Sequence, residues 1–224
     1  MTLKVFKLIA ALPCLRTASR ETQIAKKYGF LTYPQFLDNF YVRYVRFKDV
    51  NFRKVFLRHL LKNRDQVEYV VYPDYQYDMS YLLESFNVNW IFPLHRKKEF
   101  NFVLKHDFTW VGFPHRNIRF PKSLWGDYTL REYLDFCENH GLRKWYLGFW
   151  LESNPHILLR FNGLDTTLPE YYSGKCGKIW LTWNTSVKPR RPMKTIEIFE
   201  VNVRNFKKAL ENLKRTLTFK CLKP

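Results

Sequence analysis

VEYVVYPDYQYDMSYLLESFNVNWIFPLHR, residues 67–96, is the stretch that decides the fold. Two β-rich runs, VEYVVYP and VNWIFPL, flank a helical pattern, YDMSYLLESFN, and each run passes through a proline into polar residues. Apolar strand bodies that recur about every twenty residues are typical of βαβ units, whose parallel sheet is buried on both faces. The stretch therefore predicts an α/β fold built on a parallel sheet.

The same alternation extends in both directions from this stretch. Further strands are expected in FTWVGFP, KWYLGFW, FNGLD and GKIWLTW, and upstream in LKVFKLIAAL and once within residues 28–46. Residues 200–217 are expected to form a closing C-terminal helix. A total of roughly eight strands suits a small (β/α)8 TIM-barrel-like fold, with residues 1–224 as a single domain.

Charge narrows the choice of partner. The 224-residue chain carries 38 Lys and Arg against 20 Asp and Glu, a formal net charge of +18. Its hydrophobic fraction of 46% is enough for one core and excludes a disordered chain. A strongly basic folded domain indicates a polyanionic partner, with nucleic acid, DNA or RNA, favoured over an anionic membrane surface.

The cysteines give no sign of a metal site. They lie scattered along the chain, at Cys14, Cys137, Cys176 and Cys221. None has C-x-x-C spacing, so neither zinc nor a disulfide framework is indicated. We therefore expect no cofactor, and an intracellular, reducing environment.

The N-terminal stretch MTLKVFKLIAALPCLRTASR has two interpretations. Its basic start and short apolar run leave a signal peptide as one alternative. Lys4 and Lys7 interrupt the apolar run and Pro13 ends it, which favours a first strand of the fold. No apolar run is long enough to span a bilayer.

Polar residues follow the strand bodies at five places: YPDYQ, FPLHR, GFPHR, GFWLES and LDTTLP. This is where a barrel or an open α/β sheet builds its ligand site. Taken singly, each is also an ordinary polar start of a loop, but the recurrence favours a site. We expect seven side chains to converge on one face: Asp74, His95, Arg96, His115, Arg116, Glu152 and Asp165.

The series YVVYPDYQ, WIFPLHR, TWVGFPHR and WYLGFWLESNPHILLRFNGLDTTLP resembles the core of the tRNA-guanine transglycosylases and their DNA-modifying 7-deazaguanine transglycosylase relatives, which are (β/α)8 barrels. The resemblance covers about residues 67–170. It implies two catalytic residues, Asp165 as the nucleophile that attacks the ribose and Asp74 as the acid that recognises the base. Remaining substrate-binding positions are expected at Tyr75, Gln76, His95, Arg96, Gly112, His115, Arg116, Gly148 and Glu152.

The chemistry of base exchange suits these residue types. Displacement at the anomeric carbon passes through a transition state with oxocarbenium character, which a carboxylate such as Asp165 can trap covalently. A carboxylate at Asp74 would accept hydrogen bonds from N1–H and the amino group of a purine-like base. Extruding that base from its stack calls for aromatic neighbours, for which Tyr75, Phe113 and Trp150 are candidates, although core packing is the alternative for each.

The sequence also departs from that family. The serine-aspartate-serine-glycine-glycine-phenylalanine-glutamine signature is absent, and its nearest counterpart, GFLTYPQF at residues 29–36, has no acid. Of the paired glycines that lie against the base, only Gly112 is present, and the cysteine-and-histidine zinc module is missing. These differences favour, as an alternative, a basic nucleic-acid-binding barrel without turnover. A small-molecule glycosidase is a third reading, which the charge disfavours.

Two basic segments are candidates for contact with a nucleic-acid backbone. Residues 41–64 interleave cations with apolar positions, and residues 188–194, KPRRPMK, form a basic loop after the presumed eighth strand. Barrels often bind phosphate after that strand. The alternative in both cases is a solvated charged face. The residues expected to contact phosphates are Arg53, Lys54, Arg58, Lys188, Arg190 and Arg191.

Overall fold

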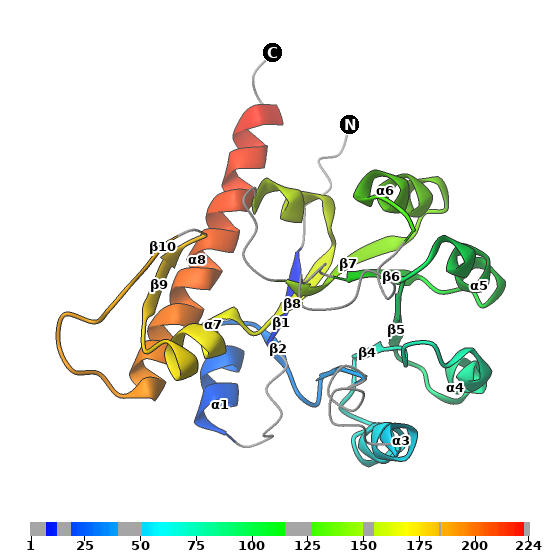
Figure 1. Cartoon of the computed structure of the whole chain (residues 1–224), viewed down its shortest axis with the longest axis horizontal. Coiled ribbons are helices and arrows are strands. Elements are labelled where there is room, and N and C mark those ends of the chain that lie inside the picture. The colour runs from blue at the N-terminus through cyan, green and yellow to red at the C-terminus, as the bar shows by residue number, and fades with distance from the viewer. Residues whose placement is uncertain are drawn as a thin grey trace. The chain divides into compact units, whose positions relative to one another are not determined.

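The computed structural model describes residues 8–12, 19–39, 51–114, 127–149, 155–183 and 185–221. Its main strands are β1 (Ile9–Leu12), β2 (Leu31–Thr32), β3 (Phe36–Leu37), β4 (Tyr69–Val71), β5 (Asn89–Pro93), β6 (Trp110–Pro114), β7 (Arg143–Phe149) and β8 (Gly163–Thr166). They run parallel in one eight-stranded sheet, in the order β2-β1-β8-β7-β6-β5-β4-β3 (Figure 1). Read cyclically, this is the strand order of a (β/α)8 barrel, so the predicted fold class is confirmed.

The chain divides into two compact units, residues 33–147 and residues 1–32 with 148–224. In the first unit, helices follow the strands in turn: α3 (Phe52–Lys62), α4 (Tyr81–Ser85), α5 (Phe100–Lys105) and α6 (Leu130–Asn139). Two 3₁₀ turns, η1 (Tyr77–Met79) and η2 (Lys97–Glu99), precede α4 and α5. The βαβ reading of residues 67–96 is therefore confirmed.

Aromatic side chains fill the interior of this unit. Trp145 is fully buried, and its ring centroid lies 5.3 Å from Phe36 and 5.4 Å from Tyr69. Residues 69–71 of β4 are buried on both faces, as expected for the apolar strand bodies of a parallel sheet. The parallel register, with Val71 opposite Ile91, brings the ends of β4 and β5 to the same edge.

Local signals set the limits of α6. The Thr129 hydroxyl accepts a hydrogen bond from the Glu132 backbone N–H at 3.2 Å, and the Glu132 carboxylate accepts one from the Thr129 N–H at 2.7 Å. This reciprocal capping satisfies two N–H groups at the start of the helix. Gly141, with φ of +66°, follows the last turn, where the left-handed conformation suits glycine.

The second unit contains β1, β2, β8 and the long C-terminal helix. Its helical segments are α1 (Arg20–Lys27), η4 (Pro155–Arg160), α7 (Leu168–Glu170), the π-helical turn η5 (Tyr171–Lys175) and α8 (Thr195–Cys221). The predicted closing helix over residues 200–217 lies within α8. Within the described ranges, no helix combines the length and the apolarity that crossing a membrane requires.

One predicted barrel strand is wrong. GKIWLTW forms β9 (Ile179–Thr182), which pairs antiparallel with β10 (Thr185–Val187) in a separate two-stranded sheet. Only one face of this hairpin is covered, because Trp180 is 2% exposed whereas Leu181 is 44% exposed. The missing barrel strand comes from residues 28–46, which hold β2 and β3 in place of the single strand expected there. The KPRRPMK loop therefore follows this hairpin and not the eighth barrel strand.

Candidate functional site

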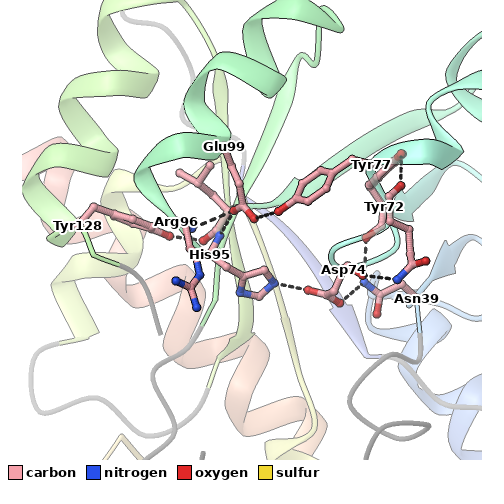
Figure 2. A network of polar contacts seen from close by, with 10 residues as sticks. Asn39, Tyr72, Asp74, Tyr77, His95, Arg96, Glu99 and Tyr128 are labelled. Carbon is pink, nitrogen blue, oxygen red and sulfur yellow. Dashed lines mark hydrogen bonds and ion pairs between the residues drawn. The ribbon is translucent and has the colours of Figure 1, made fainter. Parts of the chain in front are cut away.

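Asp74 lies just beyond the end of β4, as the strand-exit pattern predicted, and is 7% exposed. One of its carboxylate oxygens accepts a hydrogen bond from Asn39 Nδ2 at 2.5 Å, and the other contacts His95 Nε2 (Figure 2). Asn39 follows β3 and His95 follows β5, so the exits of three adjacent strands meet at this carboxylate. Asp74 and His95, two of the seven side chains expected to converge, are therefore in contact, and their roles in a site stay a prediction.

His95 is held in a polar environment with limited solvent access. Its side chain is 14% exposed, and its ring stacks on Tyr75 with a centroid distance of 4.8 Å. Burial lowers the pKa of His95, but the charge of Asp74 and its hydrogen bond outweigh burial, so the pKa lies above the ordinary 6.5. The imidazole therefore keeps its proton to a higher pH than a free histidine, and within the described residues Nδ1 has no hydrogen-bond partner, so a proton can be presented at this atom.

The loop that carries Asp74 is strained and tightly held. Tyr75 has φ of +59°, a left-handed conformation that is uncommon outside glycine and concentrates at functional sites. Gln76 Nε2 donates to the Asp74 carbonyl at 3.2 Å, and the Tyr72 hydroxyl donates to the Gln76 carbonyl at 2.8 Å. These bonds hold the backbone on both sides of Tyr75, whose ring stacks on His95.

A second buried carboxylate, Glu99, anchors the backbone of His95. Glu99 is 2% exposed and accepts hydrogen bonds from the backbone N–H groups of His95 at 2.6 Å and Arg96 at 2.9 Å. Its other oxygen accepts from the Tyr77 hydroxyl at 2.5 Å (Figure 2). Burial, followed by the hydrogen bond to Glu99, raises the pKa of Tyr77, which stays protonated as the donor. Sequence reasoning missed Asn39, Tyr77 and Glu99.

Removing Glu99 should cost more stability than removing the Tyr77 hydroxyl, one of its three donors. Glu99→Ala leaves two backbone N–H groups and one hydroxyl unpaired, so we expect a loss on the order of 2 to 4 kcal/mol in the free energy of unfolding. Tyr77→Phe deletes a single hydrogen bond and should cost about 1 kcal/mol. Urea denaturation of both variants measures the difference. Equal losses would contradict the anchoring role of Glu99.

The raised pKa of His95 predicts a pH-dependent stability. Because its folded-state pKa exceeds the ordinary 6.5, protonated His95 stabilises the fold fully below about pH 6.5. This contribution is lost as the pH rises through the raised value. Urea denaturation between about pH 5 and 8, where histidine titrates, should show the stability advantage of wild type over His95→Gln shrinking as pH increases. A widening advantage would mean that His95 is neutral in the fold.

Asp165 lies in the other unit, at the next-to-last position of β8, paired with Ala11 of β1. One carboxylate oxygen accepts a hydrogen bond from the Gly148 backbone N–H at 3.0 Å. Gly148 has φ of +64°, so glycine is favoured there for its backbone conformation. Asp165 and Asp74 belong to different units, and their predicted convergence stays a prediction.

Other predicted substrate positions have packing roles or lie outside the described residues. A Cβ on Gly112 would stand 2.3 Å from Leu147 Cδ1, so strand packing accounts for the glycine. Phe113 is 6% exposed and packs on Tyr133 and Tyr146, as core packing requires. Positions outside the described residues are His115, Arg116, Trp150 and Glu152.

The predicted phosphate-contacting cations fall into two groups. Arg53 forms a two-pronged ion pair with Asp78 at 2.8 and 3.0 Å and donates to Gln76, so it supports the loop beyond β4. The others are mostly exposed and form no ion pair with any described residue: Lys54, Arg58, Lys188, Arg190 and Arg191. These five remain available to a polyanion.

Thiol and metal chemistry find little support in the described parts of the chain. Cys137 and Cys176 are free thiols, and burial raises the pKa of Cys137 to about 12, so this thiol is protonated at neutral pH. Among the described residues, no group of three or more His, Cys, Asp or Glu side chains is arranged to hold a metal ion.

Comparison with known proteins gives one relative of undefined function. No family model matches the chain. It is 29% identical over 150 residues to the uncharacterized protein ORF192 of Acidianus two-tailed virus, an alignment that covers 63% of this chain and 70% of the relative. This similarity assigns no activity.

Proposed function

We propose that the protein binds nucleic acid and exchanges a base on it by glycosyl transfer, with His95 as the proton donor to the departing base. The contact between Asp74 and His95 carries this proposal. A buried carboxylate that raises the pKa of a histidine, beside a strained backbone position and at the strand exits of a (β/α)8 fold, is suited to general acid catalysis.

The reaction proceeds as two displacements. In the first, the bond between the anomeric carbon and the base nitrogen breaks as the Asp165 carboxylate bonds to that carbon, and the departing base takes the proton of His95. In the second, the incoming base forms a new bond to the anomeric carbon, releases Asp165 and returns a proton to His95. The role of Asp165 comes from the resemblance to the transglycosylases, and the two-step course follows from covalent catalysis.

This proposal changes the role expected for Asp74. The sequence predicted that Asp74 would accept hydrogen bonds from the base, but Asn39 and His95 already contact its two oxygens. In the proposal, Asp74 orients the imidazole and stabilises its charge, and His95 contacts the base. Asp74 is then a positioning residue in the sense that it acts through His95.

The proposal of a polyanionic partner rests on the net charge of the chain. A net charge of +18, with five exposed cations that have no described ion-pair partner, favours the phosphate backbone of a nucleic acid. A small neutral glycoside would gain nothing from these cations.

A second candidate function is nucleic-acid binding without turnover. One observation favours it: an Asp165 oxygen accepts a hydrogen bond from the Gly148 backbone, the kind of bond that a purely structural aspartate makes. The absence of the N-terminal acid signature points the same way.

Label exchange separates the two candidates. The protein is incubated with DNA or RNA oligonucleotides and labelled 7-deazaguanine or guanine, and incorporation is measured after gel separation. Incorporation into either nucleic acid supports the transfer reaction. Binding without incorporation of any base across the panel would overturn it in favour of the binding protein.

A further inference from the structure

The exposed side of α8 carries a row of cations that the candidate site does not use. Helix α8 buries an apolar stripe that includes Phe199, Phe206 and Leu210. Arg204, Lys208 and Arg215 recur at helical spacing on its exposed side and are all exposed. Helix α1 packs beside α8 in the same unit (Figure 1).

A groove of about 650 Å³ lies between α1 and α8. It is lined by Lys27, Arg204, Lys207, Lys208, Glu211 and Arg215, among others. The acids beside it are already paired: Glu200 with Lys27 at 2.9 Å and Glu211 with Lys207 at 3.9 Å. Arg204, Lys208 and Arg215 form no ion pair with a described residue, so the groove presents three exposed cations to a polyanion.

An aromatic pocket of about 530 Å³ adjoins this groove and shares Lys208 and Asn212 with it. Trp183 lines the pocket together with His156. Three edge-on contacts fix the Trp183 ring, with centroid distances of 5.9 Å to Phe149, 5.5 Å to Trp180 and 5.8 Å to Phe206. The volume falls in the range of small-molecule sites, and a rigid, partly exposed indole offers a surface for a planar ring.

We propose that the groove and the adjoining pocket bind single-stranded nucleic acid, with phosphates on Arg204, Lys208 and Arg215 and a base against Trp183. Single-strand binding sites combine a cationic track with aromatic platforms, because an unpaired base exposes a face for stacking. This site is separate from the residues of the proposed transfer reaction, and it does not depend on that chemistry.

A membrane surface fits this face poorly. Amphipathic helices bind membranes by inserting an apolar face, but the apolar stripe of α8 is packed inside its unit. Among residues 20–27 of α1 and 195–213 of α8, no large hydrophobic side chain is exposed, and the exposed apolar residue nearby is Leu181, which lines the adjoining pocket. Phosphate recognition through cations is therefore the interaction that the exposed side can make.

A matched pair of triple variants tests the site. The first replaces Arg204, Lys208 and Arg215 with glutamine. The second replaces Arg20, Lys105 and Lys175, exposed cations outside the groove, with glutamine, so that the two proteins have equal net charge. Glutamine is a good helix former, and thermal melting verifies that both variants fold. Binding of a fluorescent single-stranded oligonucleotide is measured by anisotropy over a range of salt concentrations.

The groove variant should bind at least roughly tenfold more weakly, and the slope of log affinity against log salt should fall by about 2, because each phosphate contact to a single strand contributes roughly 0.7. The control variant should keep most of the affinity. Equal losses of affinity in both variants would mean that net charge alone explains the effect, and would overturn the proposed site. A duplex of the same sequence that binds as tightly as the single strand would overturn the role of the aromatic pocket.

A further measurement uses vesicles of phosphatidylcholine and phosphatidylserine to test binding to a membrane. Wild type should not sediment with them at a salt concentration where the oligonucleotide still binds. Sedimentation that the groove substitutions abolish would assign the face to membranes. All of these experiments measure binding only. If the groove does not bind nucleic acid, the base-transfer reaction is still tested separately by label exchange.

Discussion

Replacement of His95 with glutamine is expected to lower base exchange by about 100- to 10,000-fold, the range that a general acid contributes. Glutamine keeps a polar side chain of similar reach but cannot deliver a proton to the departing base. Nucleic-acid affinity should change little, because the substitution removes no exposed cation. Initial rates of label incorporation under saturating nucleic acid measure the effect, with anisotropy as the binding control.

Asp74→Asn serves as the matched control for His95. The substitution preserves shape and removes the charge that raises the pKa of His95. We therefore expect a partial loss of rate, and an alkaline limb of the pH–rate profile that moves to lower pH. A purely structural Asp74 would leave that limb in place. Exchange by His95→Gln at the wild-type rate would eliminate His95 as the acid.

The barrel fold was predictable because the bodies of β4, β5 and β6 are short apolar runs with a proline at or just after the strand end. Residues 67–96 contain this pattern twice, and the parallel register between β4 and β5 follows from it. The pattern failed at residues 177–183, where an equally apolar run forms a hairpin with one exposed face. Composition alone does not separate a strand covered on both faces from one covered on a single face, because both contain large apolar residues.

Half of the candidate site was predictable for a geometric reason. Asp74 and His95 directly follow neighbouring parallel strands, and the ends of such strands meet at one edge. Asn39 follows a strand of only two residues, which is too short to recognise from its sequence. Glu99 lies in a run of charged residues, RKKE, that is typical of a solvated surface, and its burial depends on Tyr77 and on the backbone of His95. Glu99 accepts from the Arg96 N–H three residues earlier, but arginine is not a capping residue type, so no local sequence pattern indicated this contact.

The cations of α8 show a second limit of prediction from sequence. Their spacing predicts an amphipathic helix, but sequence does not reveal which basic side chains are neutralised by acids on another helix. Lys27 and Glu200 lie far apart in the chain and pair across α1 and α8. Arg204, Lys208 and Arg215 stand out only when such pairs are known.

Asp165→Asn is expected to abolish label incorporation and the covalent protein–nucleic acid intermediate, with a loss of at least about 10,000-fold in rate, the scale on which an enzyme depends on its nucleophile. Asparagine preserves size and can still accept the hydrogen bond from the Gly148 backbone, so folding and binding should survive. Denaturing gels of the protein after incubation with labelled oligonucleotide detect the intermediate. Asp65, an exposed acid just after α3, offers a control for the loss of one negative charge outside the proposed chemistry, as Asp65→Asn.

The outcomes for Asp165 separate chemistry from structure. Loss of the intermediate with unchanged melting and binding assigns the carboxylate to the reaction. A lower melting temperature with exchange retained would leave Asp165 as the residue that joins β8 to the backbone at Gly148. A third outcome is that wild type forms no intermediate and Asp165→Asn binds nucleic acid equally well. The net charge of +18 would then serve binding alone. The contact between Asp74 and His95 would in that case be explained by the stability that it gives to the ends of β4 and β5.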